Sequence, residues 1–389
     1  MNLLAHHRRY MGILVLAIFG LTFLSNLIPD PLARWEVRTV IIPTWSWAEK
    51  AHTAIRNTGA YMQDNFGFRA SMPTWRRAVR EAFDSPDTRP FYTGRDGQLF
   101  WGREETPEQS SGALVRRAAV QRFVFMVGEM QRVLEPLGTK IVVTIPPNAQ
   151  SVELEALPAW NDLLDYPNTE AGLAMDGLVS EGIAVVDLRK ALREAPRPRY
   201  LMTDTHWNFR TSILGFNAVM RGAGHPDWQV DLKEVLGPLQ PAPRGDILQA
   251  MRMPPQVKEE NFELRIKDRS SKPRLDPALK HHNEHFAFIS TVRDYAPTGP
   301  RVLIMGDSFS AFLWQRLFIN APVSVVGWMH GSRRVTGSCD FNFNDVKAFK
   351  PDLLIIARAE RFFPCRRADD WPTGLPKPWP GAIPRDAAP

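Results

Sequence analysis

Residues 302–310 place a serine where it could act as a nucleophile. An aliphatic run ends at Gly306, and Asp307 and Ser308 follow it. Such a run is typical of a buried strand, glycine adopts turns that larger residues resist, and residues 311–319 predict a helix that begins near Ser308. Backbone N–H groups at the start of a helix stabilise the oxyanion that forms when a serine hydroxyl attacks an ester. The pattern favours a nucleophilic serine, and a helix N-cap serine is the alternative that needs no catalysis.

Asp204 and His206 could supply the base that such a serine needs. A serine hydroxyl is a poor nucleophile near neutral pH unless a base accepts its proton. The two residues stand two apart in the chain, so in an extended segment both side chains project to the same side and the carboxylate can orient the imidazole. Serine, histidine and aspartate form such sites in several chain orders, so the order found here is no objection. A surface ion pair in a loop is the alternative for this pair taken alone.

Five apolar runs predict the strands that would position these side chains. They lack the alternation of a half-exposed strand, which is typical of strands covered on both faces. Helical patterns separate them, including a long helix over 113–137, and a hairpin is predicted over 91–101. The body is therefore predicted to be a doubly wound α/β domain with a mostly parallel sheet, with its site at the carboxyl ends of the strands. The five runs are 140–145, 183–188, 302–305, 323–326 and 352–357.

The N-terminal segment differs from the body. Residues 11–28 are nearly all apolar, and no charged residue occurs from Tyr10 to Pro29. As a helix, this run would cover roughly 27 Å, close to the hydrocarbon thickness of a bilayer. Arg8 and Arg9 precede it, so the positive-inside bias predicts a single-pass anchor in the inner (cytoplasmic) membrane, with a cytoplasmic N-terminus and a periplasmic body. A cleaved signal peptide is the alternative, which the length of the run disfavours.

Shifts in composition predict the other boundaries. We expect a cytoplasmic stub and transmembrane anchor over 1–30, a juxtamembrane helical segment over 31–90, and a catalytic domain over 91–369. Within that domain, residues 222–300 turn polar and rich in proline, which predicts an insertion that caps the sheet edge or the site. Prolines among few periodic apolar residues predict an irregular tail over 370–389.

Composition narrows the class of protein. The chain has 389 residues, 44% hydrophobic and 23% charged, which is ordinary for a globular protein and excludes wholesale disorder. Its net charge of +6 includes no dense Lys/Arg block, so no nucleic-acid partner is indicated. No cofactor is expected.

Cys339 and Cys365 are the two cysteines. A disulfide between them and two unpaired thiols both remain open, because sequence separation does not give their distance. His281, His282 and His285 have helical spacing but no further ligand cluster nearby, so no metal site is predicted.

Two motifs together carry a resemblance. The Asp-Thr-His-Trp run at 204–207, followed farther along the chain by the Gly-Asp-Ser-Phe run at 306–309, resembles the SGNH hydrolase-like acetyltransferases of the alginate O-acetylation group, the AlgJ/AlgX-like family. The chain ends soon after the last predicted strand, which favours the membrane-anchored AlgJ-like form over the form with a separate carbohydrate-binding module. Smaller matching pieces lie at 64–69, 93–100, 146–148, 245–248 and 360–361.

The resemblance implies roles and partners. It implies Ser308 as nucleophile, His206 as general base and Asp204 as the residue that orients the base. The implied reaction is transfer of acetyl groups to hydroxyls of an exported or cell-surface polysaccharide, alginate-like or another exopolysaccharide. A multi-pass acyltransferase of the MBOAT type is the implied acetyl donor across the membrane. One departure concerns the residue after Asn148. It is Ala149, where the family pattern leads us to expect a basic residue, so the groove that would bind the polymer departs from the family pattern at this position.

Five further residues are candidates for oxyanion or substrate binding. Gly306 lies in the serine turn, and Asn148 and Arg361 follow predicted strands, where they could help to hold the oxyanion or serve only as caps. Trp207 and Trp328 lie beside or downstream of the motifs and could stack on sugar rings, although aromatic residues in such places more often belong to the core.

Two other functions stay open for the same residues. An esterase would use the same three side chains with water as the acceptor, and the choice depends on how well the site excludes water and holds a sugar. An inactive, polysaccharide-binding scaffold of an export complex is the alternative from a different class of protein, and the complete set of three residues argues against it.

Overall fold

The computed structural model describes residues 90–158, 169–250, 258–266, 289–311, 313–332, 338–365 and 371–377, with positions 10, 12, 13, 15 and 16 near the N-terminus. The chain divides into two compact units, Met1–Pro86 and Asp87–Pro389. The predicted anchor and juxtamembrane helices over 1–90 lie outside the described residues, apart from those five helical positions and residue 90. Within the described part of the chain, no helix combines the length and the apolar character that crossing a membrane requires.

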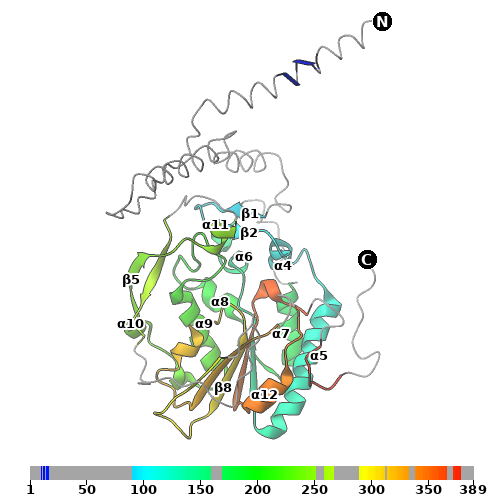
Figure 1. Cartoon of the computed structure of the whole chain (residues 1–389), viewed down its shortest axis with the longest axis vertical. Helices are drawn as coiled ribbons and strands as arrows, with labels where there is room; N and C mark the ends of the chain where they lie inside the picture. The colour runs from blue at the N-terminus through cyan, green and yellow to red at the C-terminus, as the bar shows by residue number, and fades with distance from the viewer. Residues whose placement is uncertain are drawn as a thin grey trace, which may run out of the picture. The chain divides into compact units, whose positions relative to one another are not determined.

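A six-stranded sheet forms the centre of the second unit, in the order β4-β3-β10-β8-β9-β7 (Figure 1). The first five strands of this order run parallel, and the edge strand β7 pairs antiparallel with β9. Each of the five predicted strands corresponds to a strand of the sheet, although the strand predicted over 323–326 begins two residues later and continues to His330. The strand β7 was not predicted. An edge strand pairs on one side only and needs no unbroken apolar run, so its sequence does not stand out from the polar stretch around it. The bounds are β3 Lys140–Thr144, β4 Ala184–Val186, β7 Ile289–Val292, β8 Arg301–Gly306, β9 Val325–His330 and β10 Leu353–Ala357.

Helices cover both faces of this sheet. Because successive strand side chains point to opposite faces, Ile141 and Val143 pack into one core cluster while Val142 packs into the other. Figure 1 shows α5, α7 and α12 on one side of the sheet and α9 on the other. Each fully buried aliphatic side chain stabilises the fold by roughly 1.5–3 kcal/mol, which explains the unbroken aliphatic runs. The helices are α5 Arg117–Leu134, α7 Glu170–Ser180 and α12 Phe343–Phe349 on one face, and α8 Leu188–Arg193 and α9 Phe209–Gly222 on the other.

The α5 helix matches the long helix predicted over 113–137, with different ends. Its buried apolar residues recur at spacings of three and four, from Ala119 to Leu134, so one stripe of the helix faces the sheet. The last predicted turn is a 3₁₀ turn, η3, which begins at Glu135 and contains Pro136. Proline lacks the N–H that continues an α-helix, and Gly138 then closes the segment with a φ of 84°.

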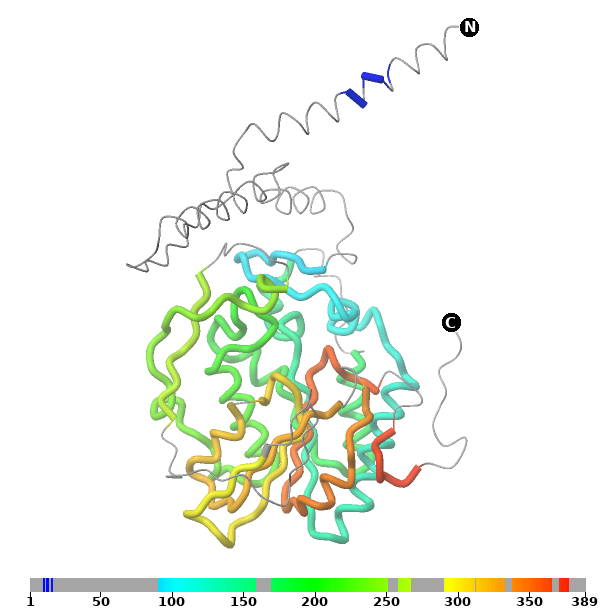
Figure 2. The backbone as a smooth tube through the Cα atoms, in the orientation of Figure 1, coloured from blue at the N-terminus to red at the C-terminus, as the bar shows by residue number. Residues whose placement is uncertain are grey.

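Two small antiparallel sheets and several short helices complete the unit. The hairpin predicted over 91–101 is confirmed as β1 paired with β2. The predicted insertion over 222–300 supplies the β5–β6 pair, the short helices α10 and α11, and the edge strand β7. Figure 2 shows β5 and β6, in yellow-green, beside the green part of the chain that includes α9, and α9 contacts β6. The bounds are β1 Phe91–Thr93, β2 Leu99–Trp101, α4 Thr106–Ser111, α6 Ala149–Val152, α10 Leu232–Val235, β5 Leu236–Pro241, α11 Asp246–Ala250 and β6 Glu260–Leu264.

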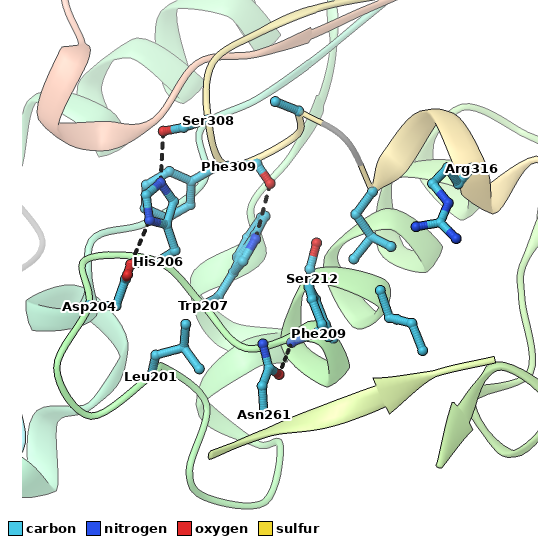
Figure 3. Close-up of a pocket in the computed structure, with 13 residues that line it drawn as sticks. Leu201, Asp204, His206, Trp207, Phe209, Ser212, Asn261, Ser308, Phe309 and Arg316 are labelled. Carbon is cyan, nitrogen blue, oxygen red and sulfur yellow. Dashed lines mark hydrogen bonds and ion pairs between the residues drawn. The ribbon is translucent and has the colours of Figure 1, made fainter. Parts of the chain in front are cut away.

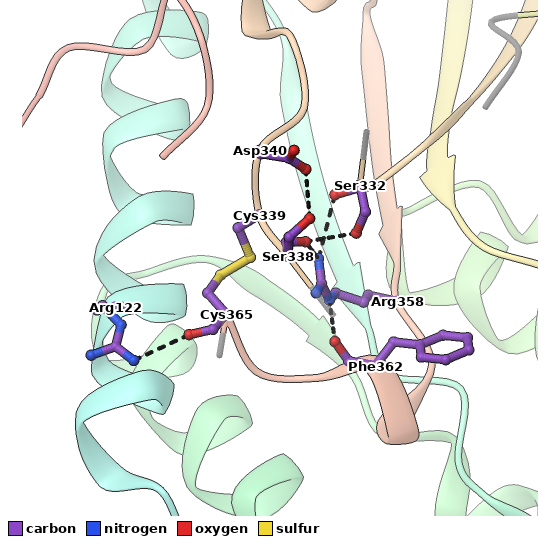
Figure 4. Close-up of a disulfide and its surroundings, with 9 residues drawn as sticks. Arg122, Ser332, Ser338, Cys339, Asp340, Arg358, Phe362 and Cys365 are labelled. Carbon is purple, nitrogen blue, oxygen red and sulfur yellow. Dashed lines mark hydrogen bonds between the residues drawn. A yellow bond between two sulfur atoms is a disulfide. The ribbon is translucent and has the colours of Figure 1, made fainter. Parts of the chain in front are cut away.

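A disulfide joins Cys339 to Cys365, with 5.3 Å between their Cα atoms (Figure 4). It settles the question that the sequence left open, and it ties the segment after β9 to the segment after β10. Both sulfurs lie in the core, beside α5, whose Arg122 donates to the carbonyl of Cys365 at 3.3 Å. From the end of β10, Arg358 donates to the carbonyl of Ser338 at 2.8 Å. The bond therefore lies within a network that holds the loops at the carboxyl ends of these two strands.

The predicted irregular tail is described only over residues 371–377. Within it, the Thr373 carbonyl accepts the Phe343 N–H at 2.8 Å and the Thr373 N–H donates to the Phe341 carbonyl at 3.0 Å. Leu375 is buried against the same region. This part of the tail therefore belongs to the core around α12.

Candidate active site

The serine turn begins where β8 ends, at Gly306, where an added side chain would meet close neighbours. A Cβ at this position would lie 2.1 Å from the Ser310 Oγ and 3.0 Å from the carbonyl oxygen of Ala357, closer than real Cβ atoms approach the first of these. The backbone of β8 therefore passes close to the end of β10, and a larger residue would have to displace the buried Ser310 hydroxyl. Ser308 emerges two residues later with an exposed side chain.

Asp307 locks this turn to the sheet. Its Oδ1 accepts the backbone N–H of Phe309 at 3.0 Å, and its Oδ2 accepts the N–H of Ala359 at 2.6 Å. Asp307 is itself only 3% exposed. One buried carboxylate thus joins the turn that carries Ser308 to the segment that follows β10.

The helix predicted over 311–319, beginning near Ser308, is wrong. The described residues after Ser308 form turns, followed by a single 3₁₀ turn, η8 Trp314–Leu317. The Ser310 hydroxyl donates to the Asp307 carbonyl at 3.2 Å, and such local side-chain hydrogen bonds compete with helix formation. Among the residues described around Ser308, no α-helix therefore begins at the serine. Among the described residues, the backbone N–H of Ser308 itself has no hydrogen-bond acceptor, which makes it an available oxyanion donor.

The histidine lies on a loop that returns the chain alongside itself. Tyr200 and Trp207 form an isolated antiparallel bridge, and the Leu201 N–H donates to the His206 carbonyl at 3.1 Å. Residues 201–206 are therefore a closed loop whose two ends are held together. This arrangement presents Asp204 and His206 on the same side, as their spacing predicts.

The structure brings Asp204, His206 and Ser308 together in one chain of contacts (Figure 3). The His206 Nδ1 lies 2.6 Å from the Asp204 Oδ1, and the His206 Nε2 lies 2.8 Å from the Ser308 Oγ. The Asp204 Oδ1 also accepts the backbone N–H of His206 at 2.9 Å. A carboxylate facing Nδ1 assigns the ring proton to that nitrogen. Nε2 is then left as the acceptor for the serine hydroxyl.

Asp204 remains ionised because its partners outweigh its burial. Burial alone would raise the pKa of Asp204, but the hydrogen bond and charge of His206 and the backbone N–H groups of Asp246 and His206 bring that pKa below its usual value. The Asp246 N–H donates to the Asp204 Oδ2 at 2.8 Å. Both carboxylate oxygens of Asp204 are therefore engaged, and the group keeps its negative charge beside the imidazole.

Two carboxylates that the sequence did not mark as site residues hold this loop from outside. Asp246, at the start of α11, accepts the Thr205 N–H at 2.8 Å. Glu259, just before β6, accepts the N–H of Met202 at 2.9 Å and of Thr203 at 2.7 Å, and the Thr203 hydroxyl as well. Asp246 lies in the short piece at 245–248 that matches the family pattern, and this match could have indicated its role. Glu259 lies in a polar stretch with no pattern that could have indicated it.

A pocket of about 420 Å³ opens beside His206 and Ser308. Its walls are mainly apolar, and Figure 3 shows it extending from the Asp204–His206–Ser308 end toward Arg316. A reacting group bound there would be partly shielded from water, which strengthens electrostatic interactions at the site. The pocket is lined by Leu201, Asp204, His206, Trp207, Phe209, Ser212, Asn261, Leu264, Ser308, Phe309, Ala311, Leu313 and Arg316.

The two candidate tryptophans support the serine turn from inside. Trp207 is 5% exposed, and its Nε1 donates to the carbonyl of Phe309 at 3.1 Å while its ring also forms part of the pocket wall. Trp328 is 8% exposed, and its Nε1 donates to the Ser310 Oγ at 3.1 Å. Trp328 is not part of the pocket lining. In this conformation both rings pack in the core, and only Trp207 also faces the pocket.

Asn148 and Arg361 lie in the segments that follow β3 and β10, and they do not line the pocket. The Asn148 side chain is buried, and its Nδ2 donates to the Ser110 Oγ at 3.0 Å. The Arg361 guanidinium lies over the ring of Phe309, 5.3 Å from its centroid. Arg361 thus packs against the residue that follows Ser308, whereas Asn148 binds α4.

Potential metal ligands occur at the site as a single small group among the described residues. Ligand atoms of Asp204, His206 and Asp246 lie within 4.8 Å of one another. In this structure these carboxylates accept hydrogen bonds from the loop that they hold. The histidines considered from sequence, His281, His282 and His285, lie outside the described residues.

Comparison with known proteins identifies the family. The model described as "SGNH hydrolase-like domain, acetyltransferase AlgX" matches residues 92–316, more than half of the chain and a range that includes both motifs. No curated protein matches the sequence.

Solved structures resemble the chain at low identity. The O-acetyltransferase domain of Pseudomonas putida AlgJ shares 17% identity, with 70% of this chain and 91% of that chain covered and a TM-score of 0.46. Bacillus cereus PatB1 shares 10%, with coverages of 70% and 98% and a TM-score of 0.50. Pseudomonas aeruginosa AlgX shares 15%, with coverages of 72% and 64% and a TM-score of 0.45. At such identities the likeness concerns the fold alone. On the family match over residues 92–316, the chain belongs to the AlgJ/AlgX-like family of SGNH hydrolase-like acetyltransferase domains.

Proposed function

We propose that this protein is an O-acetyltransferase that moves acetyl groups through Ser308 to hydroxyls of an exported or cell-surface polysaccharide. The observation that carries the proposal is the placement of His206 between Asp204 and Ser308, at 2.6 Å and 2.8 Å. Membership of an acetyltransferase family supports the choice of the acetyl group. The polysaccharide, alginate-like or another exopolysaccharide, follows from the family and not from any contact in the site.

In the first half of the reaction, Ser308 becomes acetylated. Its Oγ attacks the carbonyl carbon of the donor while the His206 Nε2 accepts the hydroxyl proton, and Asp204 stabilises the imidazolium through Nδ1. The oxyanion of the tetrahedral intermediate faces the backbone N–H of Ser308. Collapse breaks the bond to the donor's leaving group, which takes the proton from Nε2. The product is an acetyl ester on Ser308.

In the second half, a sugar hydroxyl replaces the donor. The His206 Nε2 accepts its proton as the hydroxyl oxygen attacks the acetyl carbonyl carbon. Collapse releases the acetylated sugar and returns the proton to the Ser308 Oγ. The apolar walls of the pocket disfavour water as the competing acceptor, which favours transfer over hydrolysis.

The location of the reaction determines where the acetyl group comes from. The apolar run over 11–28 supports an inner-membrane anchor with a periplasmic body. The disulfide between Cys339 and Cys365 supports an oxidising compartment. A periplasmic domain has no direct access to cytoplasmic acetyl-CoA, so an MBOAT-type membrane acyltransferase is the proposed donor.

The experiment that tests the proposal follows acetyl from a surrogate ester to the protein. Wild-type protein incubated with 4-nitrophenyl acetate should release nitrophenol and carry acetyl on Ser308, detected by peptide mass spectrometry. Ser308→Ala should lower turnover at least about 10³-fold, since removal of a serine nucleophile leaves only residual catalysis. Ser180→Ala, which changes a serine on the outer helix α7, is the matched control. Equal turnover in Ser308→Ala and wild type would reject the mechanism.

Product analysis separates the proposed transferase from the two other functions. With an oligosaccharide acceptor in excess, acetylated oligosaccharide indicates transfer, and free acetate alone indicates an esterase. Native protein that fails to react with a serine-directed probe such as a fluorophosphonate would instead favour an inactive scaffold.

A further inference from the structure

Asp246 faces the candidate base from a separate part of the chain. Its Oδ2 lies 3.5 Å from the His206 Nδ1 and accepts the Thr205 hydroxyl at 2.5 Å. Its Oδ1 accepts the Thr205 N–H at 2.8 Å. Its own backbone N–H donates to the Asp204 Oδ2 at 2.8 Å. A single residue thus contacts three consecutive residues of the histidine loop.

The backbone around Asp246 is built to dock on this loop. At the preceding residue, Gly245, a Cβ would lie 2.1 Å from the carbonyl oxygen of Thr203 and 2.7 Å from the backbone nitrogen of Asp204. The Gly245 N–H also donates to the Thr203 Oγ1 at 3.1 Å. Only glycine permits so close an approach, so segment 245–246 is fitted to the loop backbone.

We propose that Asp246 is a positioning residue for the reaction at Ser308, which fixes the Asp204–His206 loop and adds a second negative charge facing the imidazole. This inference rests on the proposed function. Asp204 orients the ring through a direct contact, and Asp246 orients Asp204 and holds Thr205 between the two. The site therefore has a carboxylate in contact with the base and a second carboxylate that holds the first in place.

The electrostatic effect of Asp246 depends on the charges that face His206. Asp204 lies on the same loop, Asp246 comes from α11, and Ser308 on the serine turn is neutral. The cation Arg361 packs on the Phe309 ring, and the imidazole contacts the same ring with 5.1 Å between the two ring centroids. A carboxylate at 3.5 Å stabilises the imidazolium that forms as Ser308 loses its proton, and does so more strongly in a partly buried site than in water. Removal of that charge should disfavour the imidazolium.

Asp246→Asn is the decisive variant, because it keeps the size of the side chain and an oxygen acceptor for Thr205 but removes the charge. We expect kcat with 4-nitrophenyl acetate to fall about 10-fold with little change in KM, in line with a loss of transition-state stabilisation. The acid limb of the pH profile of kcat/KM should move to lower pH, since the imidazolium is then less favoured. A purely structural residue would not move this limb.

Two further variants separate charge from loop shape. Thr205→Val removes the hydroxyl that contacts Asp246 but keeps its charge and its contact with the Thr205 N–H, so kcat should fall less than in Asp246→Asn and the acid limb should stay in place. Asp246→Ala removes charge and contacts together and should lower kcat about 100-fold. Unfolding temperatures of all variants, and the circular dichroism of Asp246→Ala, show whether a loss of activity arises from unfolding.

The outcomes decide the inference separately from the proposed function. Wild-type kcat and an unmoved acid limb in Asp246→Asn would overturn it, as would a loss of activity that only follows a loss of folded protein. If Ser308→Ala keeps wild-type turnover, the proposed function itself fails. The positioning role of Asp246 is then tested by the protonation state of the His206 ring. Nitrogen chemical shifts of that ring, measured by NMR, should then still show Nδ1 protonated in wild type and a mixture of tautomers in Asp246→Ala. An unchanged tautomer in that variant would overturn the positioning role as well.

Discussion

The two halves of the candidate site are held by different means. Ser308 follows a central strand whose neighbours on both sides are hydrogen-bonded to it, and a buried carboxylate, Asp307, fastens the turn to the end of β10. His206 lies on a loop outside the central sheet, closed by its own ends and held by Asp246 and Glu259 from the 236–264 segment. The serine is positioned mainly by backbone packing, and the histidine mainly by charged hydrogen bonds.

This difference indicates which substitutions each half should tolerate. A packed turn between strands has no space for added atoms, so substitutions that add side-chain volume should destabilise it. A loop held by carboxylates should respond to removal of charge, because an N–H left without its acceptor costs free energy while the rest of the fold is unaffected. The predictions that follow test this contrast, from the largest expected effect to the smallest.

Gly306→Ala should have the largest effect. The added Cβ would lie 2.1 Å from the Ser310 Oγ, so we expect the free energy of unfolding to fall by about 1–3 kcal/mol. Displacement of Ser308 by about 1 Å should lower kcat about 100-fold. Chemical denaturation and ester turnover measure the two effects. Gly331→Ala is the control, since the nearest atoms to its Cβ lie at 3.9 Å, and equal losses in the two variants would contradict the packing account of the serine turn.

Glu259→Gln should lower activity more than stability. The amide keeps one oxygen acceptor but places N–H donors against the N–H groups of Met202 or Thr203, so the histidine loop should shift. We expect kcat to fall about 10-fold or more while the unfolding temperature drops by only a few degrees. The neighbouring Glu260→Gln is the control, because Glu260 forms a surface ion pair with Lys258 and such pairs contribute little. A loss of stability without a loss of activity would show that Glu259 does not hold the loop.

Trp207→Phe tests a direct link between the two halves. The indole follows His206 in sequence and donates to the carbonyl of Phe309, which follows Ser308. Loss of this hydrogen bond should lower the free energy of unfolding by about 1 kcal/mol and turnover several-fold. Denaturation and ester hydrolysis in parallel measure both quantities. Trp328→Phe removes the comparable donor to Ser310 within the serine half and should affect turnover less, so the reverse order would contradict a role in joining the halves.

Glu360→Gln should have the smallest effect, on the pH dependence of stability. Burial raises the pKa of Glu360, and the hydrogen bonds from Asn148 and Ser151 only partly oppose it. A carboxyl whose pKa is raised in the fold favours the folded state most at pH values below its unfolded pKa, and that contribution is lost as the pH rises through the raised pKa. Wild-type stability should therefore decline as the pH rises above the ordinary glutamate pKa of about 4.3, in a way that the stability of Glu360→Gln does not. At neutral pH the variant should lie within about 1 kcal/mol of wild type. Thermal unfolding across this pH range measures the effect, and parallel curves for the two proteins would refute it.

Several elements could be predicted because their own residues carry the signal. The central strands are covered on both faces, so burial leaves unbroken aliphatic runs such as the one in β10, whose residues are all buried. The site's chemical groups could be predicted from residue type and spacing, as for Asp204 and His206. The edge strand β7 and the turn after Ser308 could not, because edge strands lack such runs and local hydrogen bonds from Asp307 and Ser310 outweigh the helical pattern.

The contacts of the remaining site residues could not be predicted from local sequence patterns. Asn148 and Arg361 follow strands, as expected of residues at the site's edge of a sheet, yet one contacts α4 and the other the Phe309 ring. Glu259 and Asp246 hold the histidine loop through atoms more than forty positions away in the chain. Such contacts leave no periodicity, because they depend on how separate segments pack.

The sequence by itself determined the class of fold, through the periodicity of buried side chains, and the kinds of side chain available for catalysis. Only the tertiary structure decided that the His206 Nε2 lies 2.8 Å from the Ser308 Oγ, that Cys339 pairs with Cys365, and that Asp246 lies behind the base. The physical reason is that hydrophobic patterning acts within single elements, whereas the distance between two side chains depends on the packing of every element between them.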